Sequence, residues 1–161
     1  MSSATNGVAP AHQQILTFQL DAQVFGVDIL RVREIRGWST VTAVPESPPH
    51  VLGVLNLRGA IVPVIDLRAR LGLPSVDATA TTVIIVLTVM VGETRRDFGL
   101  VVDAVSDVSD LQASDIQATP SGVGCGDQRS VPALATLGER MILLLDIDGM
   151  LIGDQNVALA A

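Results

Sequence analysis

The sequence predicts an all-β fold made of two tandem copies of a small strand-rich unit, and three observations support this prediction. The 161 residues are 48% hydrophobic but only 2% aromatic, so the core must consist mainly of Val, Ile, Leu and Ala side chains. Valine and isoleucine favour strands because their branched side chains are stiff and pack well on a pleated surface. Short apolar stretches alternate with turn signals, and similar phrases recur in the two halves of the chain. Short strands at regular spacing are typical of small barrels and sandwiches.

The N-terminal region predicts a tail followed by a hairpin. Residues 1–13 are small, polar and aperiodic, which is typical of a disordered tail. Residues 15–20 alternate apolar and polar side chains, as a half-buried strand does. Residues 21–23 then form a turn, and residues 24–29 return as the second strand.

The first half continues with a connector and a second hairpin. Residues 30–36 fit either a helical turn or a third strand. Three prolines within residues 45–49 indicate a connector, because proline cannot donate to a sheet ladder. Residues 51–65 predict two apolar strands joined by a tight turn. A short helix is expected at residues 66–71, where Asp66 is the N-cap and Gly72 ends the helix.

The second half predicts a similar cycle of strands and turns. Residues 81–90 form a nearly continuous apolar strand, and residues 97–102 return after a turn. Residues 114–129 are expected to be a long glycine-rich connector. The last strand is predicted at residues 141–147, with a short helix after Gly149.

An internal repeat relates the two halves. The sequence FGVDILRVREI, which begins at Phe25, aligns without gaps with FGLVVDAVSDV, which begins at Phe98, and this places Glu34 opposite Asp107. Each half later closes on a similar phrase, VIDL at residues 64–67 and LLDI at residues 144–147. We interpret these matches as two copies of one unit. The alternative is that both phrases are common sequence patterns at the ends of strands and do not indicate a repeat.

Charge and composition exclude several classes of function. The formal net charge of −7 argues against binding to nucleic acid or to anionic lipid, both of which need clustered basic residues. Cys125 is the single cysteine, so no intrachain disulfide forms and a reducing compartment is indicated. The N-terminus lacks the pattern of a secretory signal, and the longest apolar run, residues 83–91, is about half of a membrane-spanning helix. We therefore expect a cytoplasmic protein that does not insert into a membrane.

Residues suited to catalysis or metal binding are few. The two histidines, His12 and His50, have no cysteine, histidine or carboxylate partner at metal-ligand spacing. Cys125 has no histidine nearby to act as a base. The glycines around it do not have the spacing of a phosphate-binding loop, and residues 146–149 lack most ligands of a calcium loop. We therefore expect no enzyme activity, no cofactor and no metal.

Two polar residues at the turn within residues 51–65 stand out. A hairpin needs apolar residues for its core, but it does not need Asn56 and Arg58 for that purpose. Asparagine is common beside turns, and the arginine could simply be a solvated side chain at the tip of the hairpin. We hypothesise that Glu34 pairs with Arg58 across the fold. If exposed, such a pair contributes about 0–1 kcal/mol, so its use would be to orient Arg58 toward a partner.

At these residues the chain resembles the CheW family of bacterial chemotaxis coupling proteins. Four phrases carry the resemblance, in family order, over about residues 13–152. They are FGVDILRVREIR at 25–36, GVLNLRGAIVPVIDLR at 53–68, GLVVDAVSDV at 99–108 and LGERMILLLD at 137–146. Each phrase alone is moderately specific, but four of them in order are strongly specific.

The resemblance implies two tandem SH3-like five-stranded β-barrels with short helices over residues 14–152. The first barrel would cover about residues 14–78 and the second about residues 79–152, with strand exchange between halves allowed and a short tail at residues 153–161. It implies a non-catalytic adaptor that joins the cytoplasmic tips of chemoreceptors to the regulatory domain of the histidine kinase CheA. The adaptor would be recruited to membrane-associated receptor arrays.

The resemblance also assigns partner-binding positions. The glutamate and arginine that are functionally sensitive in the family match Glu34 and Arg58, and Asn56, Leu57 and Gly59 belong to the same turn phrase. The receptor-facing region matches Val32, Val101, Val102 and Asp103. The glycine-rich stretch at residues 120–132 departs from the family, as does the chain end soon after residue 152. Two alternatives remain open: an adaptor in a non-flagellar receptor–kinase pathway, and a small-ligand-binding barrel in which Arg58 holds an anion.

Overall fold

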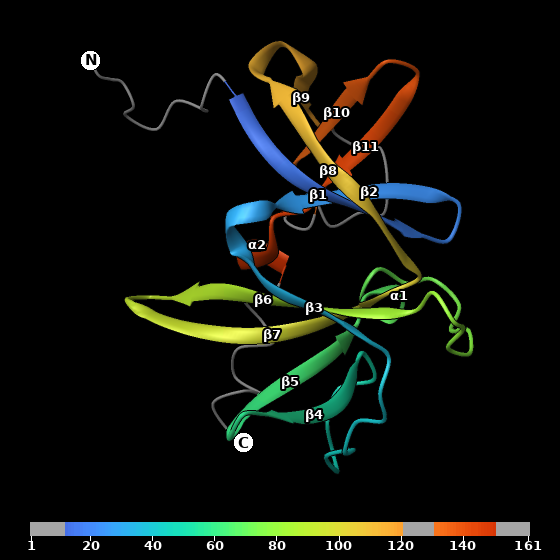
Figure 1. Cartoon of the computed structure of the whole chain (residues 1–161), viewed down its shortest axis with the longest axis vertical. Coiled ribbons are helices and arrows are strands. Elements are labelled where there is room, and N and C mark those ends of the chain that lie inside the picture. The colour runs from blue at the N-terminus through green and yellow to red at the C-terminus, as the bar shows by residue number, and fades with distance from the viewer. Residues whose placement is uncertain (1–11, 121–130, 151–161) are drawn as a thin grey trace.

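Two β-sheets form the protein in the computed structural model, which describes residues 12–120 and 131–150 (Figure 1). The six-stranded module has the strand order β8-β1-β2-β11-β10-β9. Its strands are β1 (His12–Leu20), β2 (Gln23–Asp28), β8 (Ala104–Gln112), β9 (Ile116–Ala118), β10 (Ala133–Leu137) and β11 (Arg140–Leu144). The five-stranded module has the order β3-β6-β7-β5-β4. Its strands are β3 (Val32–Gly37), β4 (Val51–Leu57), β5 (Ala60–Asp66), β6 (Val83–Val91) and β7 (Thr94–Val102).

The helical elements are short and mostly lie where the modules meet. The helices are α1 (Leu67–Arg70) and α2 (Ile147–Met150), and the 3-10 turns are η1 (Ile29–Arg31) and η2 (Ala113–Asp115). Figure 1 shows α1 and α2 between the upper six-stranded module and the lower five-stranded module. The predicted cap of α1 is confirmed, because Asp66 accepts a hydrogen bond from the Arg68 amide and Gly72 follows with φ +81°.

The all-β prediction is confirmed, but the modules do not follow the order of the chain. The N-terminal hairpin β1–β2 pairs with strands from the C-terminal part, whereas β6 and β7 join strands from the first half. A division of the chain at residue 78 therefore does not separate the modules. One module has the expected five strands, and the other gains a sixth because the three-residue β9 pairs with β10.

The internal repeat is reproduced in the pairing of the strands. Phe25-Gly26 in β2 runs parallel to Leu143-Leu144 in β11, and Gly99-Leu100 in β7 runs parallel to Val64-Ile65 in β5. The β3–β6 ladder is interrupted at Arg33, and the β8–β1 ladder is interrupted at the matching position. Each copy therefore pairs with the closing phrase of the other copy, which is the strand exchange that the sequence analysis allowed.

Several sequence-based boundaries differ from the structure. Residues 30–36 contain both proposed elements, because η1 is followed directly by β3. The predicted connector at 114–129 was wrong at its start, where η2 and β9 occur, and strands β8 and β10 were not predicted. β1 includes His12 and Gln13, which the prediction assigned to the tail, and α2 begins two residues before Gly149. The rest of the predicted tail, Cys125 with its glycines, and residues 151–161 lie outside the described residues.

Three apolar clusters fill the fold. The largest joins both modules and includes Phe18 and Phe25, whose rings stack with centroids 5.8 Å apart, together with Phe98. A second cluster lies within the six-stranded module around Ile15, Leu111, Ala135 and Ile142. The third lies within the five-stranded module and consists of Leu57, Val62, Ile84 and Val86. The two modules thus share a continuous core, which fixes the surfaces described below.

Candidate functional site: a surface ion pair at a strained hairpin

The β4–β5 turn presents an arginine in a conformation that glycine prefers. Leu57 pairs with Ala60, so Arg58 and Gly59 are the two turn residues, with φ values of +52° and +89°. Two positive φ angles are typical of the hairpin turns that match the twist of the strands. The side chain of Asn56 stabilises this turn, because its Oδ1 accepts a hydrogen bond of 2.9 Å from the Gly59 amide. Asn56 thus holds the backbone that projects Arg58.

The matching turn in the other module shows what the backbone alone would select. Leu137 pairs with Arg140 across the β10–β11 turn, and its first turn residue is Gly138, with φ +63°. An L-residue in this left-handed region is strained by about 1–2 kcal/mol relative to the right-handed one, whereas glycine is not. Arg58 therefore occupies a position where a glycine fits the backbone better.

Glu34 receives two arginines from neighbouring elements. Arg58 Nη2 lies 2.6 Å from Glu34 Oε1, and Arg36 Nη1 lies 3.2 Å from Glu34 Oε2. The predicted Glu34–Arg58 pair is therefore confirmed. Hydrogen bonds from Arg58, and next from Arg36, lower the pKa of the Glu34 carboxyl. The side chain of Arg58 is 75% exposed and that of Glu34 is 25% exposed. The pair therefore fixes one edge of the guanidinium and leaves its other N–H groups exposed to solvent or to a partner.

The ion pair also joins the two edge strands of the five-stranded module. Glu34 lies on β3 and Arg58 follows β4, and these strands stand at opposite ends of the strand order. The chain after β3 reaches β4, where Thr42 and Val54 exchange two backbone hydrogen bonds of 3.0 and 2.8 Å. Gly53 permits this approach, because a Cβ at that position would lie 2.1 Å from the Thr42 carbonyl oxygen. These contacts therefore link the two edges of the five-stranded sheet, β3 with the segment after it and β4.

The remaining predicted site residues lie deeper. Leu57 is 8% exposed and Val102 is 1% exposed, and both belong to the core clusters. Val32 and Val101 are half-buried and pack against those clusters. Leu57 and Val102 therefore support the surface from within and offer little area to a partner. The structure brings Asn56, Arg58, Gly59 and Glu34 together, and it places Val102 and Asp103 at the module junction.

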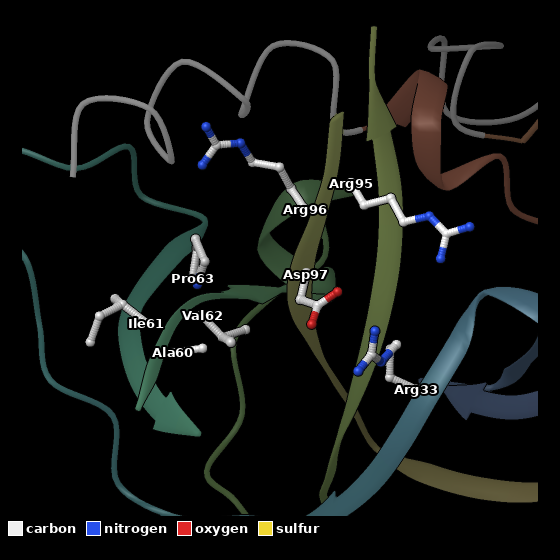
Figure 2. Close-up of a pocket in the computed structure, with 8 residues that line it drawn as sticks. All are labelled: Arg33, Ala60, Ile61, Val62, Pro63, Arg95, Arg96 and Asp97. Carbon is white, nitrogen blue, oxygen red and sulfur yellow. The ribbon is translucent and has the colours of Figure 1, made fainter. Parts of the chain in front are cut away.

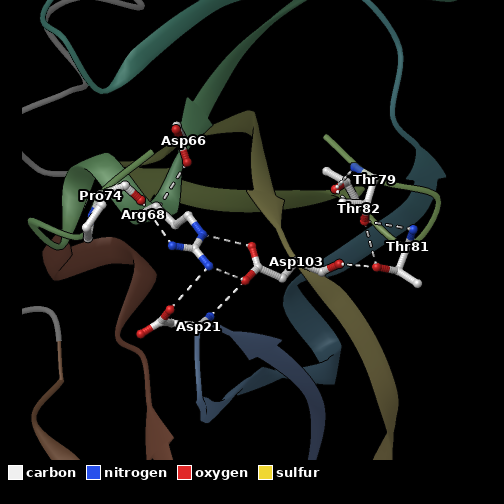
Figure 3. Close-up of polar contacts among 8 residues, drawn as sticks. All are labelled: Asp21, Asp66, Arg68, Pro74, Thr79, Thr81, Thr82 and Asp103. Carbon is white, nitrogen blue, oxygen red and sulfur yellow. Dashed lines mark hydrogen bonds and ion pairs between the residues drawn. The ribbon is translucent and has the colours of Figure 1, made fainter. Parts of the chain in front are cut away.

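Asp103 is held within the chain by Arg68, a residue that the sequence analysis did not single out (Figure 3). Arg68 Nε and Nη2 donate to the two Asp103 carboxylate oxygens at 3.0 and 2.6 Å, and Nη1 donates to the Pro74 carbonyl at 3.0 Å. Asp21, in the β1–β2 turn of the other module, donates its amide to Asp103 Oδ2 at 2.8 Å. This cluster therefore joins the modules. The sequence does contain a signal for Arg68, because this arginine follows an apolar strand and the aspartate, Asp66, that caps α1.

The pair is largely buried on the arginine side. The side chain of Arg68 is 9% exposed and that of Asp103 is 30% exposed. The Arg68 hydrogen bonds are the main cause of a lowered pKa at Asp103, and Asp103 in turn raises the pKa of Arg68. Both groups are thus kept charged. Because its carboxylate already accepts two hydrogen bonds from the Arg68 guanidinium, the main role of Asp103 is to link the two modules.

A metal site requires clustered ligand side chains, and a membrane-spanning helix requires a long apolar segment. Across residues 12–120 and 131–150, no group of three or more His, Cys, Asp or Glu side chains could hold a metal ion. Asp146 caps α2 by accepting from the Gly149 amide at 3.2 Å, and Asp148 pairs with Arg31 at 2.6 Å. In the same described part of the chain, no helix is long and apolar enough to cross a membrane.

Comparison with known proteins agrees with this arrangement. The CheW-like domain family matches residues 14–155. The probable chemotaxis protein CheW of Rhizobium etli is 41% identical over 150 residues, which cover 93% of this chain and 94% of that protein. The chemotaxis protein CheW of Klebsiella aerogenes is 41% identical over 143 residues, which cover 89% of this chain and 84% of that one. The crystal structure of the scaffolding protein TtCheW from Thermoanaerobacter tengcongensis superposes with a TM-score of 0.78 at 31% identity, covering 86% of this chain and 91% of that chain.

The match of this two-module fold to the CheW-like domain family and to the structure of a scaffolding protein places the chain in a scaffold or adaptor class of protein. The chain belongs to the CheW family of chemotaxis scaffold proteins.

Proposed function

We propose that this protein couples the cytoplasmic tips of chemoreceptors to the regulatory domain of the histidine kinase CheA, without itself catalysing a reaction. The observation that carries the proposal is the ion pair between Glu34 and Arg58 at a strained turn. A glycine would relieve the strain and an exposed ion pair contributes little stability, so folding alone does not explain the arginine. Binding to a partner does. Family membership supplies the class of partner.

Exposed apolar side chains in the segment that carries Glu34 also suit a protein partner. Leu30 in η1 is 87% exposed, and Ile35, on the face of β3 opposite to Glu34, is 45% exposed. A receptor tip is a helical hairpin, and an amphipathic helix docks its apolar face on such residues. Specific interfaces bury about 800 Å² per partner, which one face of a module can supply. Weak single contacts gain strength when many receptors and kinases assemble together.

This proposal places the protein in the cytoplasm, recruited to membrane-associated receptor arrays. Signalling then requires only that the receptor state changes the preferred geometry of the complex. Neither a nucleic acid nor a cofactor has a role in this mechanism.

Co-sedimentation with receptor-containing membranes, with and without CheA, tests the proposal. Arg58→Ala should reduce both recruitment and kinase activation. The matched control is Arg140→Ala, because Arg140 is an exposed arginine beside the equivalent turn of the other module. Arg140→Ala should behave as wild type. Normal coupling by a folded Arg58→Ala variant would reject this site. Absence of recruitment of the wild-type protein would favour a different receptor–kinase pathway.

A further inference from the structure

A second basic surface lies between strands β5 and β7 of the five-stranded module. A groove with a volume of about 490 Å³ opens there, and Figure 2 shows the side chains around it. The residues that matter for its chemistry are Arg33, Arg95, Arg96, Asp97, Ile61 and Pro63. Neither the ion pair at Glu34 nor the joint at Asp103 uses any of them.

The groove exists because two parallel strands separate. β5 and β7 pair only where Val64–Asp66 meets Gly99–Val101. The preceding parts of both strands, Ala60–Pro63 and Thr94–Phe98, have their outer ladders with β4 and β6 but none with each other. Alternate backbone groups on these facing edges are therefore left without a sheet partner. Such an edge is a template for an added strand.

The hairpin beside the groove is an extension that the other module lacks. In the β1–β2 hairpin, the ladder ends two pairs beyond the Phe18–Phe25 pair. In the equivalent β6–β7 hairpin, it ends four pairs beyond the Leu87–Phe98 pair. The additional two residues per strand lengthen the hairpin by about 7 Å. The lengthened part carries Arg95, and Arg96 lies at its base, so the extension adds a positive charge to the edge of the groove.

The charge of the groove is unusual for this chain. The formal net charge is −7, and all ten basic residues are arginines. Within residues 12–120 and 131–150, the ion pairs involve other arginines, and no carboxylate pairs with Arg33, Arg95 or Arg96. Arg96 Nε is moreover buried without a hydrogen-bond partner among the described residues. The carboxylate of Asp97 accepts from Thr88 Oγ1 at 3.0 Å. Among the described residues, therefore, none of the three guanidiniums forms an ion pair with a carboxylate.

We propose that this groove binds an extended acidic segment of a partner protein, which adds as a strand beside β5 or β7. Its carboxylates would pair with Arg33, Arg95 and Arg96, and an apolar side chain would cover Ile61, which is 59% exposed. A small anion fits less well, because Figure 2 shows Arg95 and Arg96 pointing to opposite sides of the hairpin, with Arg33 on another strand. One small ion cannot contact guanidiniums spread in this way, whereas an extended chain can. This inference is independent of the Glu34–Arg58 site.

The test uses a fluorescein-labelled peptide of alternating glutamate and valine, with the corresponding glutamine–valine peptide as its neutral counterpart. Fluorescence anisotropy should show that the full-length protein binds the acidic peptide and not the neutral one. The double variant Arg95→Gln/Arg96→Gln should lower the affinity about tenfold, since two ion pairs of up to about 1 kcal/mol each are lost. Arg140→Gln should bind as wild type. Hydrogen exchange should slow at residues 60–62 of β5 or 94–98 of β7, on whichever edge receives the added strand, when the acidic peptide binds.

Several results would overturn the proposal. Equal binding of the neutral peptide would show that the arginines are not used, as would an unchanged affinity in a folded double variant. Displacement of the peptide by millimolar inorganic phosphate would assign the groove to a small anion. Self-association in sedimentation that disappears in the double variant would assign it to a second copy. Arg58→Ala should leave peptide binding intact, so failure here and failure of the coupling function can be distinguished.

Discussion

Replacing Arg58 by glycine separates the function of the β4–β5 turn from its contribution to stability. Arg58 adopts φ +52°, where an L-residue is strained by about 1–2 kcal/mol. Glycine removes this strain, but it raises the entropy of the unfolded chain, which lowers stability by about 0.4–1 kcal/mol. Loss of the pair with Glu34 changes stability little, because solvent screens an exposed ion pair. The free energy of unfolding should therefore change by less than about 2 kcal/mol, because the relief of strain is offset in part by the entropic loss.

Urea denaturation and thermal unfolding measure this prediction directly. A change of about 1 kcal/mol corresponds to about 2–4 °C in Tm for a chain of this size. Arg58→Ala retains the strained backbone and loses the pair, so it should be less stable than Arg58→Gly. Both variants should lose coupling to receptor and kinase to the same extent. The reasoning would be refuted if Arg58→Gly lost more than about 2 kcal/mol, since Arg58 would then be a structural residue.

The titration of Glu34 gives an independent measure of the same contact. Its pKa lies below the model-compound value of 4.5, and Arg58 is the leading cause. In either Arg58 variant, NMR titration should show the Glu34 pKa rising toward that value, with Arg36 still lowering it. Because the folded-state pKa is depressed, the ion pair is present above the unfolded-state pKa and is lost as the pH falls through the folded-state value. An unchanged pKa would mean that the pair does not form in solution.

Two further predictions concern the core and the junction between modules. Gly99→Ala places a Cβ 2.9 Å from a buried methyl group of Ile84, so chemical denaturation should show a loss of about 1–3 kcal/mol in the free energy of unfolding. The control is Gly37→Ala, where a Cβ meets nothing within 4 Å and the effect should be nearly neutral. Equal effects of the two substitutions would exclude the close contact at Gly99. Asp103→Asn leaves the buried Arg68 guanidinium without its counterion and should cost about 3 kcal/mol. Because the pKa of Asp103 is depressed in the folded state, its stabilisation is present above the ordinary aspartate pKa and is lost as the pH falls through the folded value. The stability difference between wild type and Asp103→Asn should therefore shrink in acid, and a constant difference would contradict the pairing.

Local sequence predicted the elements whose signals are complete within a few residues. The alternation of residues 15–20, the hairpin with Asn56 and Arg58 at its turn, and the cap at Asp66 all occur as expected. The Glu34–Arg58 pair was also predicted, because the repeat and the turn fix where each residue stands on its own strand. Strand β8, in contrast, was missed because polar residues interrupt its apolar pattern, which leaves no clean alternation.

The sequence by itself determined that the protein is all-β, that it contains a repeated unit and that a polar turn marks its surface. Only the tertiary structure decided which copy of the repeat pairs with which. The parallel contacts of β2 with β11 and of β7 with β5 join segments that are distant in the chain, and either pairing would satisfy the same local pattern. The shared core around Phe18, Phe25 and Phe98 selects the exchanged arrangement, because hydrophobic burial depends on the whole assembly. The same long-range geometry buries Arg68 against Asp103 and opens the basic groove, which no local pattern could show.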